Sequence, residues 1–376
     1  MWWIALILLP LVWVAIDLAA GFRARRHANT ELTHGWNEDF SVLVPIYGDA
    51  RYLANRAYLA DYGDRVVLCT TSGETEAFYA EIESLAQNHG WRIYRSPYSP
   101  ITESKKRRTG GVIRDRVIRD ALLHLDGLGA YSICIDADTE TSRPLQELAG
   151  ALQESGADFA SIDLVPQRDG GMLVQLQRHE YRQSMRMRFL LPWMLSGACH
   201  IGKTDTFRQI MARHSLFFQG NDVEAGLLGD QLGYRAVHLP FPVETEVPSR
   251  FKPWWRQRIA WAGGEFRLFI TNFRYIIKHP FLWVYGGLIA IMMFGLRWMS
   301  LVDPSWILLG VAVLYYIGIL WIHWRTRNWW LLLLPPYALL HSLVLTPIGI
   351  LWYFVMAIPE KNFGVIRPRS EVEVTA

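Results

Sequence analysis

Apolar residues in the first part of the central region occur in short runs separated by polar turns, a pattern typical of buried strands. Runs at 40–45 and 65–69 predict two strands, and a helical stretch at 74–88 leads to a third strand at 91–94. A fourth run begins at Tyr131 and has no polar face, which favours a central strand of a parallel sheet. This succession of strands and helices predicts a doubly wound α/β domain.

The fourth run ends in two aspartates, within the sequence YSICIDADTE of residues 131–140. If the chain stays extended, the spacing of two puts Asp136 and Asp138 on the same side of the strand. A hard divalent ion takes one or two protein carboxylates and completes its shell with water and phosphate oxygens. The pair therefore predicts an Mg²⁺ or Mn²⁺ site for a substrate with a diphosphate. The alternative is a polar strand end that caps the next helix through Thr139 or Thr141.

The first 20 residues are almost entirely apolar, which is long enough for a helix that crosses a bilayer. The basic residues Arg23, Arg25 and Arg26 follow this run instead of preceding it. A cleaved signal peptide has its charge in front, so we expect residues 1–21 to be a retained anchor whose downstream side faces the cytoplasm.

Three further apolar segments lie near the other end, at 281–296, 306–324 and 329–358. The first two predict a transmembrane hairpin, and together the three predict a membrane bundle over 281–358, followed by a tail at 359–376. The third segment contains three prolines, so one tilted helix, one kinked helix and a pair of short segments all remain open.

The formal net charge of this 376-residue chain is only +3, which gives no indication of a nucleic-acid partner. A basic loop, KKRR at 105–108, precedes two glycines. It suits a diphosphate, or it is a solvated run of charge. His179 and His200 have no second ligand at metal spacing, so we expect them to pack or to form hydrogen bonds.

Six motifs occur in the order and spacing of the membrane-bound family 2 glycosyltransferases, which include cellulose, chitin and hyaluronan synthases. They are SVLVPIYGD, ICIDADTE, SGA, NDVEAGLLGDQLGYR, TEVPSRF and WWRQRIAW. The chain resembles this family over about residues 38–270. The resemblance implies a GT-A catalytic domain at 38–250, an interfacial segment at 251–279, a nucleotide-sugar donor, a divalent metal and inversion at the anomeric carbon.

The resemblance also implies roles for residues at the donor. It places Asp138 on the metal, and Asp136 toward both the nucleotide and the metal. It implies donor contacts from Pro45 and Tyr47, after the first strand, and from Lys106 in the basic loop.

Asp222 matches the aspartate that serves as general base in the family. A carboxylate within hydrogen-bond reach can take the proton of an acceptor hydroxyl as the new sugar bond forms. The alternative is structural: Asn221 caps a helix, and Glu224 completes a capping box. The resemblance places Ser196, Gly197 and Ala198 near the acceptor, although small residues equally suit a tight turn.

The family has a matching motif at Gln257, Arg258 and Trp261. The resemblance implies that Gln257 and Arg258 bind the donor phosphates, and that the Trp261 indole packs against the acceptor sugar. The sequence departs here, because Ala260 stands where the family has an arginine next to the tryptophan. The alternative is an interfacial helix at the lipid headgroups.

A further departure lies after Cys69, where the family often has an aspartate that reads the base and this chain has no acid until Glu74. Asn221 is another departure, since the family frequently has an acidic residue at this position. A UDP-sugar is still the donor that we expect. These departures keep open a third interpretation, a non-catalytic membrane receptor for a nucleotide or a carbohydrate.

We therefore expect an inverting glycosyltransferase anchored in the plasma membrane, with its catalytic domain in the cytoplasm and membrane lipids around it. The motifs favour a synthase that lengthens a polysaccharide, and the alternative is transfer of one sugar to a lipid acceptor. Four spans are few for a polymer channel, so a homo-oligomer and a separate export partner both remain open.

Overall fold

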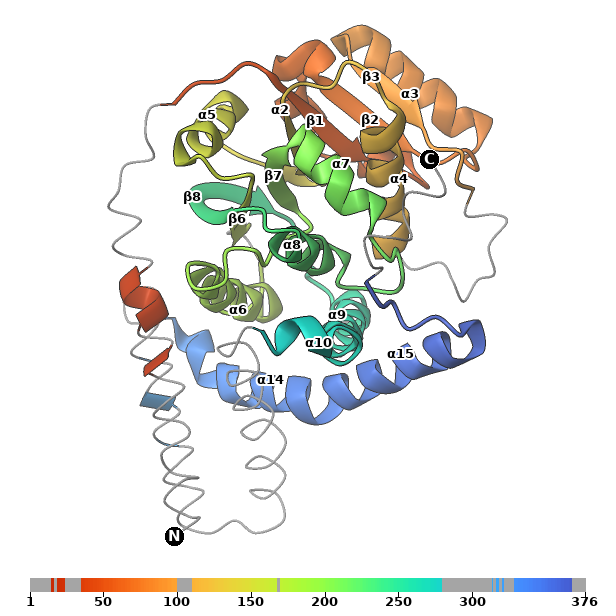
Figure 1. The fold of residues 1–376 in the computed structure, drawn as a ribbon. Helices are drawn as coiled ribbons and strands as arrows, with labels where there is room; N and C mark the ends of the chain where they lie inside the picture. The colour runs from red at the N-terminus through yellow and green to blue at the C-terminus, as the bar shows by residue number, and fades with distance from the viewer. Residues whose placement is uncertain are drawn as a thin grey trace. The chain divides into compact units, whose positions relative to one another are not determined.

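The computed structural model describes residues 15–16, 19–23, 35–99, 110–167, 170–278, 313, 316–317, 320 and 328–366 (Figure 1). The predicted anchor at 1–21 and the predicted hairpin at 281–324 lie almost wholly outside the described residues, and Lys106 lies outside them. The chain divides into two compact units, which are described separately. The sheet unit comprises residues 30–165, 191–246 and 356–376, and the helical unit comprises residues 1–29, 166–190 and 247–355.

The sheet unit is built on an eight-stranded sheet. Its strands are β1 (Phe40–Pro45), β2 (Val66–Thr70), β3 (Arg92–Arg95), β4 (Tyr131–Ile135), β5 (Thr139–Glu140), β6 (Phe159–Pro166), β7 (Cys199–Lys203) and β8 (Ala236–Thr245). Its helices are η1 (Ala50–Tyr52), α2 (Arg56–Leu59), η2 (Ala60–Arg65), α3 (Glu76–His89), α4 (Gly110–His124), α5 (Leu145–Ser155), α7 (Thr204–Ala212) and α8 (Asn221–Gln231). The predicted strands β1 to β4 and the predicted helix α3 are confirmed to within two residues.

The strand order is β3-β2-β1-β4-β7-β6-β8-β5. Strands β1, β2, β3 and β4 pair in parallel, but β7 pairs antiparallel with both β4 and β6, and β5 pairs antiparallel with β8. The expectation of a parallel sheet around β4 is therefore wrong on one side of that strand. Every residue of β4 is buried, and a strand covered on both faces has the same continuous apolar pattern whichever way its neighbours run.

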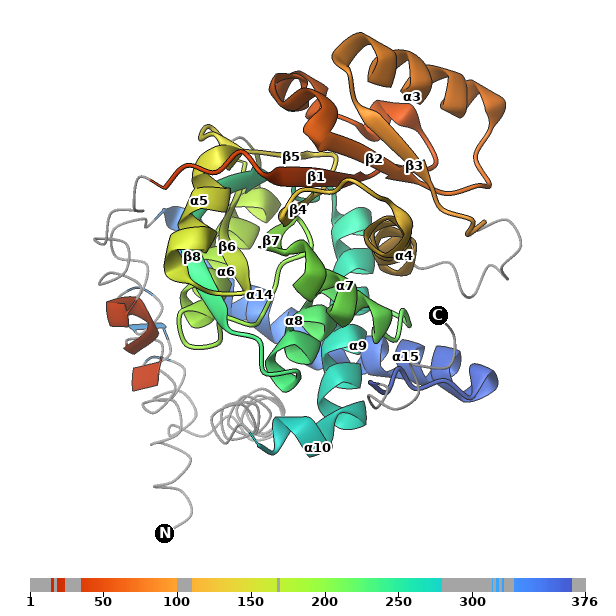
Figure 2. The same ribbon diagram turned by 45° about the horizontal axis from the view of Figure 1, so that its top comes forward.

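Local signals explain where these elements begin and end. Helix α3 starts two residues later than predicted because Thr75 is its N-cap, and the Thr75 hydroxyl accepts the Phe78 N–H at 3.2 Å. It ends at Gly90, whose φ of 70° is the left-handed conformation that closes many helices. Helix α4 packs against β1, β2 and β3 and also contacts α7 and α8 (Figure 2).

The helical unit contains two long helices and a segmented helical run. Its elements are α6 (Met172–Arg188), α9 (Phe251–Thr271), α10 (Phe273–Ile276), η5 (Trp329–Leu333), α14 (Leu334–Leu340), the π-helix η6 (His341–Leu345) and the start of α15 (Thr346–Glu360). A buried cluster of Trp254, Tyr337, Leu176, Leu331, Leu334 and Leu345 joins α6, α9 and the segmented run.

The predicted third apolar segment is helical without a break from Leu334 to Glu360. Its first two prolines lie in the first turn of α14, where backbone N–H groups have no partner within the helix. Pro347 follows the π-helical turn, a local widening that often accommodates a disturbance of the hydrogen-bond ladder. Among the described residues, one helical run, Trp329–Glu360, is long and apolar enough to cross a membrane, and 33% of its most apolar window is buried.

Candidate active site

The two aspartates after β4 lie on a tight turn. The strand ends at Ile135, and the Thr139 N–H donates to the Asp136 carbonyl at 3.1 Å, so the condition that the chain stays extended through Asp138 is not met. The Asn55 amide donates to the carbonyls of Asp136 and Thr139, at 3.0 and 2.6 Å. These two bonds stabilise the turn. The alternation of residues along the strand does not reveal them, because Asn55 is distant in the chain.

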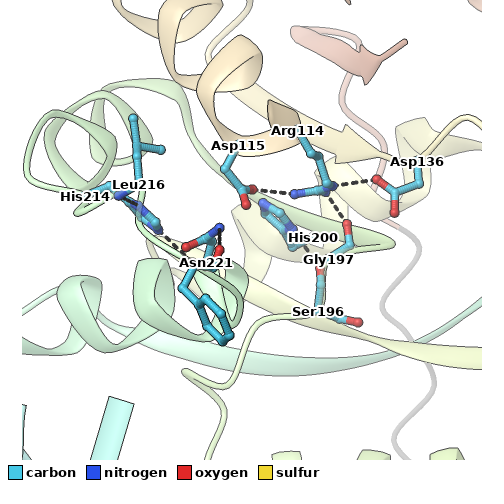
Figure 3. Close-up of polar contacts among 10 residues, drawn as sticks. Arg114, Asp115, Asp136, Ser196, Gly197, His200, His214, Leu216 and Asn221 are labelled. Carbon is cyan, nitrogen blue, oxygen red and sulfur yellow. Dashed lines mark hydrogen bonds and ion pairs between the residues drawn. The ribbon is translucent and has the colours of Figure 1, made fainter. Parts of the chain in front are cut away.

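A buried arginine connects this turn with its surroundings. The Nε of Arg114, on α4, donates to Asp136 Oδ1 at 2.6 Å, and its Nη1 donates to Asp115 Oδ1 at 2.6 Å (Figure 3). Its Nη2 donates to the Gly197 carbonyl. The burial of Arg114 is offset by the charges of Asp136 and Asp115, which hold its pKa well above the ordinary value. The Arg114 guanidinium therefore connects helix α4 with the aspartate turn and with the loop at Gly197.

Asp222 lies beside Gly197. A Cβ added to Gly197 would be 3.5 Å from Asp222 Oδ2. The Asp136 N–H donates to the Ala198 carbonyl at 2.9 Å, so the 196–198 loop is bonded to the aspartate turn. Burial raises the pKa of Asp115, and the negative charges of Asp222 and Asp136 add to that rise. The structure thus gathers around this loop the predicted base and the predicted nucleotide-binding aspartate.

Asp138 adds a further carboxylate to this region. Burial, and then the charge of Asp136, raise its pKa to about 6. A divalent cation would relieve this repulsion. No group of three or more His, Cys, Asp or Glu side chains suited to a metal occurs within the described ranges, but Mg²⁺ and Mn²⁺ commonly need only one or two protein carboxylates. The hard oxygen donors of Asp136 and Asp138 therefore fit such an ion.

The helix that carries Asp222 follows a strained loop. Leu216 and Phe218 have positive φ angles of 49° and 65°, a conformation that costs non-glycine residues about 1–3 kcal/mol each. Asn221 does not cap α8: Gly220 occupies the cap position, and the Asn221 amide donates to the Phe218 carbonyl at 3.1 Å. The proposed capping interaction is wrong because the chain turns into the helix one residue earlier.

Two buried side chains hold this loop in place. Glu224 accepts the Ser215 N–H at 2.7 Å and the Ser215 hydroxyl at 2.8 Å. His214 Nδ1 accepts the Leu216 N–H at 3.0 Å, so its Nε2 carries the proton donated to the Asn221 carbonyl at 2.8 Å (Figure 3). Glu224 is therefore structural, as expected, but it holds the loop instead of a capping box.

The predicted donor and acceptor residues of the sheet unit lie near this region. Pro45 ends β1, and burial followed by the charge of Asp136 raises the pKa of Tyr47. Ser196 is buried, and its carbonyl accepts the Nδ1–H of His200 at 2.8 Å. His200 thus forms a hydrogen bond, as expected, and so does His179, with Asn328 at 3.0 Å.

Glu74, the first acid after β2, forms hydrogen bonds within the protein. Glu74 accepts the Gly48 N–H at 2.9 Å through one oxygen and the Thr71 hydroxyl at 2.5 Å through the other. Its carboxylate therefore links the loops that follow β1 and β2.

The remaining predicted residues belong to the helical unit. Arg258 is fully buried on α9, and its Nη2 lies 2.8 Å from a Glu180 oxygen. Its guanidinium carbon lies 4.1 Å from the centre of the Trp261 ring, and its Nη1 donates to the Gln257 amide oxygen at 3.1 Å. Tyr337 donates to the same Glu180 oxygen at 2.7 Å. Trp261 remains 39% exposed.

Sequence reasoning missed Arg114 and Asp115. A signal for their burial exists, because Arg114 lies three and seven residues before Val117 and Ala121, which are both buried on α4. A charged side chain on the apolar face of a helix needs an internal partner. The spacing does not identify that partner, since Asp136 and Gly197 come from distant segments.

One protein family matches this chain. The model of the glycosyl transferase family group 2 matches residues 132–322, just over half of the chain. The mixed sheet fits a GT-A domain. No curated protein matches the sequence.

Two solved structures show a limited likeness. One is a crystal structure described only as that of a mycobacterial protein; it is 17% identical, with 61% of this chain and 77% of that one covered at a TM-score of 0.39. The other is mouse xyloside xylosyltransferase 1 in its apo form, 13% identical, with coverage of 53% and 78% and a TM-score of 0.26. At these TM-scores neither carries an argument about function.

Proposed function

Since the chain belongs to the glycosyl transferase family group 2, we propose that it transfers a sugar from a nucleotide-sugar, with inversion, to an acceptor at the cytoplasmic face of a membrane. A UDP-sugar is the proposed donor and a growing polysaccharide the proposed acceptor. The observation that carries this proposal is the position of Asp136 and Asp222 beside the same small loop, with Arg114 bonded to that loop.

Asp222 is the proposed general base. It is half-buried in the first turn of α8, and the buried bonds of His214 and Glu224 fix the loop before it. A fixed carboxylate can take the proton of an acceptor hydroxyl as that oxygen attacks the anomeric carbon. Gly197 has no side chain, and an added Cβ would lie 3.5 Å from Asp222 Oδ2, so a larger residue here would occupy the space beside this carboxylate.

Asp136, Asp138 and Arg114 are proposed to serve the donor. A divalent cation held by Asp138 and Asp136 would supply charge neutralisation of the departing diphosphate. Arg114 compensates the charges of Asp136 and Asp115, which otherwise would repel each other and Asp222. Pro45, Tyr47 and Lys106 are proposed donor contacts.

The helical unit is proposed to supply the acceptor platform. Trp261 offers a partly exposed indole, and Arg258 and Tyr181 contact the ring. Such an indole can pack against the apolar face of a sugar. Arg258 forms an ion pair with Glu180, so we propose that it orients the Trp261 ring. Gln257 is then the proposed phosphate contact of this motif.

The test is to incubate the purified protein with Mn²⁺ and each of a panel of labelled nucleotide-sugars, and to measure both nucleoside diphosphate release and product size. We expect turnover with one donor and a product of many sugars. A product of one sugar per lipid would reject the polysaccharide acceptor. Binding of a nucleotide-sugar without turnover would reject the enzyme in favour of a receptor.

A further inference from the structure

The aspartate turn, which runs from Asp136 to Thr139 after β4, is bound by two consecutive residues from a distant part of the chain. The Ala54 and Asn55 backbone N–H groups both donate to the Ala137 carbonyl, at 2.9 and 3.1 Å. The Asn55 side-chain amide donates to the carbonyls of Asp136 and Thr139, at 3.0 and 2.6 Å. Two residues therefore bind three of the four carbonyl groups of the turn.

The side chain of Asn55 makes these bonds instead of capping its own helix. Asn55 is the N-cap residue of α2, where an asparagine oxygen ordinarily accepts an N–H group of the first turn. No such bond forms within the described residues of α2, and the side chain, which is 3% exposed, contacts a turn 81 residues away in the chain. The opposite amide orientation is excluded, since it would set the side-chain oxygen against two carbonyl oxygens.

Other residues bind the carboxylates of the turn. The Arg114 Nε donates to Asp136 Oδ1 at 2.6 Å (Figure 3). The Thr139 hydroxyl lies 3.1 Å from Asp138 Oδ1. The hydrogen bonds of the Asn55 side chain, in contrast, go to the backbone. Asn55 thus fixes the path of the chain through the turn, whereas Arg114 acts on one of the side chains that the turn carries.

The path of this turn decides where the two carboxylates meet. Because β4 ends at Ile135, strand alternation does not bring Asp136 and Asp138 to one side. Their directions depend instead on the backbone conformation that the Asn55 bonds maintain. Mg²⁺ demands a near-ideal octahedral shell at about 2.0–2.1 Å, so a displaced carboxylate weakens its binding. Residues that orient metal ligands without touching the ion commonly change metal affinity by about 10–100-fold.

The oxygen of the Asn55 amide adds a second observation. Within the described part of the chain, Asn55 Oδ1 is buried and has no hydrogen-bond partner. A buried acceptor without a partner is unfavourable, so its presence in a folded protein needs a reason. The amide nitrogen supplies that reason, because neither a hydroxyl nor an apolar side chain could donate to two carbonyls at once. The two bonds to the turn therefore offset an unfavourable buried oxygen.

We propose that Asn55 is a positioning residue for the metal site. By holding the carbonyls of Asp136 and Thr139, it fixes the aspartate turn in the conformation that lets Asp136 and Asp138 bind one divalent ion. Asn55 acts through the turn, not on the ion or on the donor. This inference rests on the proposed function, in which that ion neutralises the departing diphosphate of the donor.

The test is to titrate Mn²⁺ into the purified full chain with UDP present, and to follow the electron paramagnetic resonance signal of free Mn²⁺. Asn55→Leu keeps a similar side-chain volume without a donor, and the dissociation constant of Mn²⁺ should rise by about 10–100-fold. Asn55→Ala leaves space in which water can replace the amide, so a smaller rise is expected, and this variant serves if the leucine variant does not fold. Turnover in both variants should recover at saturating Mn²⁺, which a simple loss of folded protein would not allow.

Ser132→Ala is the matched control, because Ser132 lies on the same strand β4 and its buried hydroxyl lies 2.8 Å from the Thr204 hydroxyl. This variant also loses a buried hydrogen bond, but its Mn²⁺ affinity should equal that of the parent protein. Equal Mn²⁺ affinity in the parent and in both Asn55 variants would overturn the role of Asn55 and leave the proposed function intact. Weakening by Ser132→Ala to the same extent would overturn it too. Absence of Mn²⁺ binding by the parent, or equal binding by Asp138→Ala, would instead overturn the metal site itself.

Discussion

Two regions of this molecule are organised around buried arginines, and they differ in charge balance. In the sheet unit, Arg114 accompanies four nearby carboxylates, those of Asp115, Asp136, Asp138 and Asp222. In the helical unit, Arg258 faces the carboxylate of Glu180, two amides and an aromatic ring.

The difference separates chemistry from positioning. The sheet-unit cluster has an excess of negative charge, which favours a cation or a proton and suits a site that binds a metal and a phosphate ester. The helical-unit cluster is balanced, and its guanidinium is fully buried, so it stabilises a helix contact and an indole orientation. We therefore expect substitutions in the first region to change turnover as well as stability, and those in the second to change stability and acceptor affinity but not the chemical step.

The largest expected effect is that of Asp222→Asn in the sheet unit. Removing the proton acceptor should lower turnover by about 10²–10⁴-fold while donor affinity stays close to that of the parent protein. Release of nucleoside diphosphate and calorimetric donor titration measure the two quantities. Asp205→Asn, at an exposed residue of α7, is the matched control. Unchanged turnover in Asp222→Asn would mean that another group is the base.

A direct comparison of the arginines comes next. Arg114→Met leaves Asp115 and Asp136 without their buried partner, and loss of one member of such a pair costs about 3–5 kcal/mol. Arg258→Met should cost less, about 1–3 kcal/mol, because Glu180 keeps its hydrogen bond from Tyr337. Thermal unfolding in detergent gives the order of the two effects.

The surface variant Arg51→Met is a control, since its ion pair with Asp49 is exposed and the unfolding midpoint should not change. Equal shifts for the two buried arginines would remove the distinction between an unbalanced and a balanced cluster. Arg258→Met should also weaken acceptor binding through a mobile Trp261, whereas donor affinity should not change. A loss of donor affinity would instead restore Arg258 as a phosphate contact.

The extent to which the sequence predicts each region follows from the range of the interactions. Strands β1 to β4 were predictable because their apolar runs are local, and the same is true of the position of Asp136 at a strand end. The turn after β4 was not, since it depends on Asn55, about 80 residues away in the chain. The antiparallel pairing of β7 with β4 was not predictable either, because a fully buried strand such as β4 has the same apolar sequence beside a parallel or an antiparallel neighbour.

The helical unit was harder to predict for a different reason. An apolar run of 30 residues has the same composition whichever helix it packs against, so its sequence does not identify that partner. Gly349 and Tyr353 mark the buried side of α15, but their partners Ile259 and Phe266 lie nearly 90 residues earlier. Local patterns therefore predict the helix, and only the packing shows which side of it is buried.

A smaller effect is expected at His200, beside the acceptor loop of the sheet unit. Burial, together with the charge of Arg114, lowers its pKa from 6.5 to about 3. The unfolded chain therefore binds a proton that the folded chain does not as pH falls below 6.5. The stability contributed by the neutral ring is complete above pH 6.5 and is lost as pH falls toward 3.

The measurement is the unfolding midpoint of the parent protein and of His200→Gln between pH 7 and pH 4.5, a range set by that lowered pKa. The parent midpoint should fall more steeply, and the variant should show a flatter profile whatever its absolute stability. His124→Gln, at an exposed residue of α4, should keep the parent slope. Parallel profiles for the parent and His200→Gln would show that the ring binds protons equally in the folded and unfolded chains, which would contradict the lowered pKa.

An effect on stability alone is expected at the helix contact of the helical unit, where no charge is involved. In Gly349→Ala the new methyl group would lie 2.5 Å from the Ile259 carbonyl oxygen and 2.8 Å from the Gly263 nitrogen, so α15 and α9 must separate. Overpacking of this kind costs about 1–3 kcal/mol. Gly171→Ala is a suitable control, because a Cβ there meets no atom within 4 Å. A lower unfolding midpoint for Gly349→Ala with unchanged donor affinity would locate the damage in the helical unit, whereas an unchanged midpoint would mean that the two helices are not held together at this glycine.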